Sequence, residues 1–131
     1  MNREIKFRAW SKLDEKMFIV MGYDLVEDEV WSYHNPYSFQ EIELMQHTGL
    51  KDKNGVEIYE GDVVQWSVDV QGEEPLSDTY TVVYQHGGFY LENIKHFSPK
   101  YEPLSEVVRF DGEYQVIGNI YENTEPLKEK E

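Results

Sequence analysis

The sequence predicts an all-β protein built from short antiparallel strands. Apolar residues recur with a period of two, rather than the helical 3.6, along most of the chain. Several segments are nearly all β-branched or aromatic, and T-Y-T-V-V-Y at 79–84 is the clearest of them. Turn signals made of Gly, Asn and Asp divide these segments into short pieces, which is the pattern of an antiparallel sheet.

The first half of the chain predicts extra strands with a weaker signal. In I-K-F-R-A-W, the side chains of Ile5, Phe7 and Ala9 alternate with those of the other three residues, so the two sets should lie on opposite faces. Asn35-Pro36 should end a strand, because proline has no backbone donor. In Q-E-I-E-L-M-Q-H at 40–47, alternation resumes and predicts that the side chains at positions 42 and 44 share one face. The predicted strands of this half are 5–10, 17–20, 29–33 and 40–47.

The second half predicts a small barrel. Asn54-Gly55 suits a type I′ hairpin turn, in which both central residues have positive φ. Glu60-Gly61-Asp62 predicts a second turn, and Gly118 a bulge or a close approach. Residues 69–78 should form a polar loop, residues 94–103 an irregular stretch and residues 104–108 a single helical turn. Strands are predicted at 63–68, 79–84, 89–91 and 114–117.

This order of strands and turns resembles an SH3-like barrel, with the N-terminal strands packed on it. The predicted division is an N-terminal β subdomain at 1–45, the barrel at 46–123 and a charged, frayed tail at 124–131. The length of 131 residues suits one domain or two very small ones. An aromatic content of 15% is too high for a disordered chain.

Charge and composition limit the classes of molecule that the protein is expected to bind. The net charge is −14, but residues 1–16 carry +2 and residues 57–78 carry −7. Phosphate backbones attract Lys and Arg, so the charge argues against nucleic acid as a partner. No apolar run approaches the roughly 18 residues of a membrane span, and no signal peptide is recognisable at the start. The chain has no Cys, which fits a reducing compartment. We therefore expect a cytoplasmic protein that has no membrane partner.

The sequence contains no catalytic motif. The four histidines, His34, His47, His86 and His96, lack the spacing of metal ligands, and D-K-N-G-V-E at 52–57 lacks the length of a calcium loop. We therefore expect no metal and no cofactor. The sequence leaves open, as an alternative, a small-ligand protein or an enzyme whose carboxylates come from Glu57, Glu60 and Asp62. Because turn carboxylates usually stay solvated, the sequence favours a protein that is not an enzyme.

Acidic and aromatic residues of the second half are candidates for an interaction surface. Tyr and Trp suit interfaces because one end of each side chain is polar. The same aromatic residues also suit ordinary core packing. The candidate surface is Glu60, Asp62, Trp66, Glu73, Glu74, Tyr84, Phe89 and Tyr90.

Three blocks of the sequence resemble the YopX family of phage and prophage proteins. They are R-E-I-K-F-R-A-W followed by K-M, T-G-L-K-D-K-N-G-V-E-I-Y-E-G-D-V-V at 48–64, and V-I-G-N-I-Y-E-N at 116–123. The resemblance implies a phage or prophage gene, the cytoplasm of a bacterial host and a β-rich fold. It supplies no catalytic residue, because the family has no established biochemical role.

The sequence therefore favours a non-enzymatic accessory protein that works through protein contacts. Its acidic segment suggests a basic host partner. Uncharged strands such as 79–84, together with the separation of charge along the chain, also favour a homo-oligomer.

Overall fold

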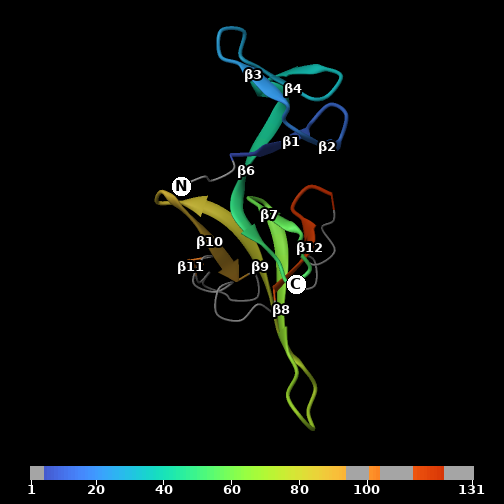
Figure 1. Cartoon of the computed structure of the whole chain (residues 1–131), viewed down its shortest axis with the longest axis vertical. Helices are drawn as coiled ribbons and strands as arrows, with labels where there is room; N and C mark the ends of the chain where they lie inside the picture. The colour runs from blue at the N-terminus through green and yellow to red at the C-terminus, as the bar shows by residue number, and fades with distance from the viewer. Residues whose placement is uncertain (1–4, 94–100, 104–113, 123–131) are drawn as a thin grey trace. The chain divides into compact units, whose positions relative to one another are not determined.

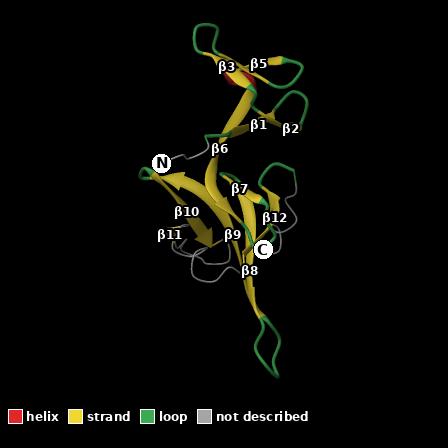
Figure 2. Ribbon diagram, in the orientation of Figure 1, coloured by secondary structure: helices red, strands yellow, loops and turns green. Residues whose placement is uncertain are grey.

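The computed structural model of the chain describes residues 5–93, 101–103 and 114–122. Strands and the turns between them account for nearly all of this part of the chain (Figure 2). The only helix within it is a single 3₁₀ turn at Phe39–Glu41. The prediction of an all-β protein is thus confirmed. The predicted helical turn at 104–108 and the tail at 124–131 lie outside the described residues.

The strands form three antiparallel sheets (Figure 1), with orders β2-β1-β6-β7, β3-β4-β5 and β11-β10-β9-β8-β12. Contacts divide the chain into two compact units, Met1–His47 (unit 1) and Thr48–Glu131 (unit 2), and the division falls inside β6. The bounds of the strands are β1 Phe7–Ser11, β2 Lys16–Ile19, β3 Gly22–Asp24, β4 Glu29–Trp31, β5 Pro36–Ser38, β6 Ile42–Lys51, β7 Glu57–Tyr59, β8 Asp62–Val68, β9 Leu76–Gln85, β10 Gly88–Asn93, β11 Tyr101–Pro103 and β12 Tyr114–Asn119.

Unit 1 has its own small apolar core. Ala9, Val30, Tyr37 and Ile42 are buried together. Phe18 packs against them and stacks on Tyr37, with 4.8 Å between the ring centroids. Each of these residues comes from a different strand, so the core holds the two sheets of the unit together by burial of apolar area.

Two details of unit 1 refine the predictions. The strand predicted at 29–33 does end before Asn35-Pro36, as β4, but Pro36 itself opens β5, where it pairs with Trp31. β5 lies at the edge of its sheet, and there a missing backbone donor costs little. In β6, Ile42 and Leu44 pair with Ser11 and Ala9 in a regular register, so their side chains lie on one face as predicted, although only Ile42 is buried and Leu44 is 40% exposed.

Unit 2 is built on the five-stranded sheet. Cross-strand pairs place Val64 beside Tyr80 and Val82 beside Leu91 on one face of the curled sheet. These residues pack with Ile58 and Tyr114 to form the second core. The predicted strand at 79–84 is confirmed as the centre of β9, and 114–117 as the start of β12. The stretch at 94–103, predicted as irregular, contains strand β11, which pairs with β10.

The β8–β9 hairpin extends beyond the rest of its sheet (Figure 1). In the described part of the chain, β12 pairs with β8 as far as Trp66, and β10 pairs with β9 as far as Tyr80. Beyond these points, β8 and β9 pair only with each other among the described residues, for example at Ser67 and Ser77. We call residues 67–78 the β8–β9 arm. The loop predicted at 69–78 is therefore shorter, because residues 76–78 belong to β9.

Candidate functional site

The turn after β6 is not of type I′. Gly55 has a φ of +83°, but Asn54 is not among the residues with positive φ. The Gly55 N–H donates to the Asp52 carbonyl, and the Asp52 N–H donates to the Val56 carbonyl. This pattern is a three-residue hairpin loop whose last residue is the left-handed glycine. The type I′ prediction for Asn54-Gly55 is therefore wrong, although the need for glycine at 55 stands.

A buried aspartate explains why the turn takes this other form. Asp52 is only 7% exposed, and its Oδ1 accepts the N–H groups of Asn54 and Val56 at 2.8 and 2.9 Å. Its Oδ2 accepts the N–H of Val116, on β12, at 2.8 Å. One carboxylate thus fixes the loop and ties it to a strand 64 residues away. The register of β12 against β8 shifts between Val116 and Gly118, next to this contact.

The second turn also uses its aspartate for architecture. Gly61 has a φ of +89°, its N–H donates to the Val82 carbonyl, and its carbonyl accepts the N–H of Ile120. Asp62 is 2% exposed, and its Oδ2 accepts the Tyr59 N–H at 2.8 Å. The structure therefore places Asp62 in the interior rather than on the predicted surface. Glu60, in the turn itself, is half-buried.

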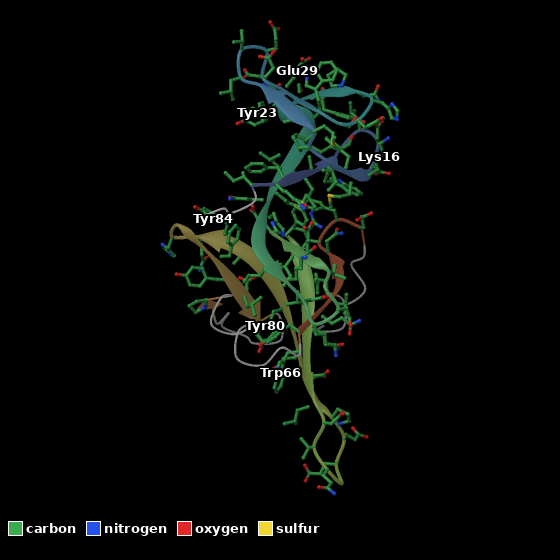
Figure 3. The ribbon with its side chains drawn as sticks, viewed as in Figure 1. Lys16, Tyr23, Glu29, Trp66, Tyr80 and Tyr84 are labelled. Atoms are coloured by element: carbon green, nitrogen blue, oxygen red, sulfur yellow. The ribbon has the colours of Figure 1, made fainter. Side chains whose placement is uncertain are left out.

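The remaining predicted surface residues do not form one patch. Trp66 and Phe89 are partly buried and pack against the core of unit 2. Tyr84 is 51% exposed and meets Phe89 edge to face, with 5.2 Å between centroids, at the end of β9 away from Trp66 (Figure 3). Tyr90 alternates with Phe89 and so lies on the other face of the sheet. Glu73 and Glu74 are exposed in the β8–β9 arm.

Exposed apolar side chains gather instead in unit 1. Of the thirteen large apolar side chains that are exposed in the described part of the chain, ten belong to unit 1, so this unit is the better candidate for an interface. The ten are Ile5, Leu13, Ile19, Met21, Tyr23, Leu25, Val26, Trp31, Tyr33 and Leu44.

Part of this surface is hollowed into an apolar pocket. Its volume is about 190 Å³, and its lining consists of Phe7, Val20, Tyr23, Leu25, Val30, Phe39 and Leu44. The only side-chain polar atom in that set is the hydroxyl oxygen of Tyr23, a residue that is 60% exposed. Such a lining suits an apolar group and contains no charged side chain. No local pattern in the sequence indicates the pocket, because its lining residues come from several strands and the segments between them.

The described residues offer little for catalysis or metal binding. No group of three or more His, Asp or Glu side chains in that part of the chain is arranged to hold a metal ion. The Tyr37 hydroxyl donates to Asp14 at 2.6 Å, and this hydrogen bond, together with burial, raises the pKa of Tyr37 above 10.0. The one helix within those residues has three residues, too few to cross a membrane.

Comparison with known proteins finds a matching family model and a similar solved structure. The family model described as YopX protein matches residues 6–128. The crystal structure of protein EF1440 from Enterococcus faecalis is similar, with a TM-score of 0.66 and 27% sequence identity. The match covers 96% of this chain and 99% of that one. No curated protein matches the sequence significantly.

Proposed function

The chain belongs to the YopX family, and from this premise we propose that it is a phage or prophage accessory protein that binds a protein partner and catalyses no reaction. The observation that carries the proposal is the apolar pocket of unit 1 with its exposed rim. Soluble proteins rarely leave large apolar side chains exposed together unless another molecule covers them. Its working place is the cytoplasm of the bacterial host, which agrees with a Cys-free sequence.

The pocket suits one kind of anchor. Its volume of about 190 Å³ and its apolar lining suit a single Leu, Phe or Trp side chain inserted by the partner. Leu25, which is 72% exposed, and Val26, which is 88% exposed, lie at the rim and next to it in sequence. These two residues would become buried when the partner docks, and their burial would contribute binding free energy.

Unit 2 is proposed to act as the scaffold, as an SH3-like small barrel. The support is its curled antiparallel sheet of five strands in the order β11-β10-β9-β8-β12. Aromatic side chains of this sheet, such as Trp66, are committed to its core, so in this proposal the barrel contributes stability rather than recognition.

The test is a pull-down from host lysate followed by mass spectrometry. Leu25→Asp with Val26→Asp places two charges where the partner must dock and should abolish capture of any specific partner. Val56→Asp is the matched control, because Val56 is also exposed, at 47%, but belongs to unit 2. The proposal is contradicted if the Leu25 and Val26 variant captures the same proteins as the wild type.

The salt dependence of the capture tests the nature of the partner. The net charge of −14 attracts a basic partner over a range that dissolved salt shortens. For a basic host protein, capture should weaken steadily as salt is added. Capture that does not change with salt would support the apolar contact but remove the basic partner.

A further inference from the structure

A second groove of unit 1 follows the free edge of a strand. It has a volume of about 270 Å³ and is lined by all four residues of β2, by Met21 and by residues 32–35 of the β4–β5 turn. β2 is the outermost strand of its sheet, with β1 on its inner side. The groove therefore lies where a further strand of this sheet would be placed.

The backbone groups of β2 that face the groove have no partner among the described residues. Val20 N–H donates to Phe7 on β1, and antiparallel pairing alternates, so the N–H and C=O groups of Met17 and Ile19 point away from β1. The Met21 N–H, two residues further along and on the same side as that of Ile19, donates to the Trp31 carbonyl at 2.8 Å. No such bond reaches Met17 or Ile19 from any described residue.

The opposite wall does not supply these bonds, because its own polar groups bond to each other. The Ser32 N–H donates to the Asn35 carbonyl at 2.8 Å, and Ser32 Oγ accepts the N–H groups of His34 and Asn35. The turn is thereby closed on itself. Exposed strand edges of this kind are templates for pairing with another strand.

The charge of the groove is opposite to that of the protein. Its lining contains Lys16 and His34 and no carboxylate, in a chain whose net charge is −14. Among the described residues Lys16 has no ion-pair partner, whereas Lys12 lies 3.2 Å from Glu43. Ile19, at 51% exposure, adds an apolar surface beside the cation. The groove therefore suits an extended segment that carries both carboxylates and an apolar side chain.

The β8–β9 arm has this chemistry. It carries Asp69, Glu73, Glu74 and Asp78 and no Lys or Arg. Leu76 in the arm is 56% exposed. Its two strands pair only with each other at Ser67 and Ser77, so their outer edges are also without a described partner. An isolated two-stranded hairpin is marginally stable, and a third strand would stabilise it.

We propose that the groove beside β2 is a strand-addition site for the β8–β9 arm of a second copy of the chain. The arm adds backbone hydrogen bonds at Met17 and Ile19, and its carboxylates lie near Lys16. The contact is head-to-tail, because the groove of one copy takes the arm of the next. It uses a different surface from the apolar pocket, so it does not depend on the proposed function.

Light scattering after size exclusion, at low ionic strength and rising protein concentration, tests this contact. The wild type should exceed the monomer mass of 15.6 kDa, and added salt should lower its mass. Ile19→Pro removes a donor that the described fold does not use and should reduce the protein to monomers. Lys16→Glu, which reverses the groove charge without touching the backbone, should do the same. Circular dichroism confirms that each variant is folded.

The contribution of the arm to assembly is tested by Glu74→Lys. Glu27→Lys is the matched control, because both glutamates are exposed. Only the former should dissociate the assembly. A mixture of Ile19→Pro and Glu74→Lys proteins should form a dimer of twice 15.6 kDa, because one supplies an intact arm and the other an intact groove. A wild type that stays at 15.6 kDa, or an assembly that survives both variants, overturns the inference. Either result leaves the test of Leu25 and Val26 unaffected.

Discussion

At the residue scale, two turn residues of the 48–64 block carry most of the local specificity. Gly55 supplies a φ of +83°, and Asp52 supplies a carboxylate that accepts three backbone N–H groups. Neither residue is placed for chemistry. Both define how the chain leaves β6 and how β12 is attached, which makes the block architectural.

Gly55→Val should destabilise the protein by about 1–3 kcal/mol, because a β-branched residue resists a positive φ. An added Cβ would meet no heavy atom within 4 Å, so the expected cost is backbone strain. Gly22→Val is the control, since Gly22 also has open space but its φ is not in the left-handed region. Urea unfolding of both variants measures the difference. Equal losses would contradict the turn geometry.

Asp52→Asn should cost about 1–3 kcal/mol, because an amide has only one acceptor atom for the three N–H groups that the carboxylate accepts. The NH₂ group would face a backbone donor in a site that is 7% exposed. Asp69→Asn, at an exposed position, should change the free energy of unfolding little. A loss no larger than that of Asp69→Asn would show that the carboxylate does not hold β12.

Because of Tyr37, we expect the free energy of unfolding to fall in alkali. Its pKa in the folded protein is raised above 10.0 by its hydrogen bond to Asp14 and by burial, so above pH 10 the unfolded chain gives up the phenolic proton more readily. This contribution is fully present below pH 10 and falls as pH rises toward the folded pKa. Unfolding in urea at pH 8 to 11 should show a shallower decline for Tyr37→Phe than for the wild type, while Tyr33→Phe should follow the wild type.

At the element scale, the β8–β9 arm is the segment that should open first. Residues 71–77 are all exposed, and the arm has no other strand beside it among the described residues. Limited proteolysis of the monomer, at a protein concentration too low for assembly, should therefore make its first cut within residues 5–93 in the loop at 69–75. Mass spectrometry of the fragments locates the cut. First cuts at 79–84, in the centre of the sheet, would contradict the arrangement.

The sequence predicted long elements better than short ones. The β-branched run at 79–84 has a period that can be read, and the structure contains it as part of β9. β3, β5 and β11 have three residues each, too few to show a period. The dipeptide with two positive φ values, which a type I′ turn requires, is His86-Gly87 and not the predicted Asn54-Gly55. His86 and Gly87 have φ values of +51° and +79°, and they form the two-residue connection between β9 and β10.

At the scale of the whole molecule, the candidate site was harder to predict than the fold. Alternation along a strand separates two faces but does not say which face becomes covered, so Trp66 fitted a surface as well as a core. The contact between Asp52 and Val116 joins residues 64 positions apart and leaves no local pattern. The apolar pocket draws its walls from β1, β3, β4, β6 and the residues between them, so only a folded chain displays it.

The division of the chain inside β6 has an evolutionary consequence. Proteins exchange domains by recombination at linkers, where a breakpoint leaves both parts intact. Here the boundary between the units falls after His47, and the strand continues without interruption to Lys51. A breakpoint at that position would divide a strand and deprive both units of part of a sheet. The two units should therefore be inherited together, and a gene that carries one alone should be rare among relatives.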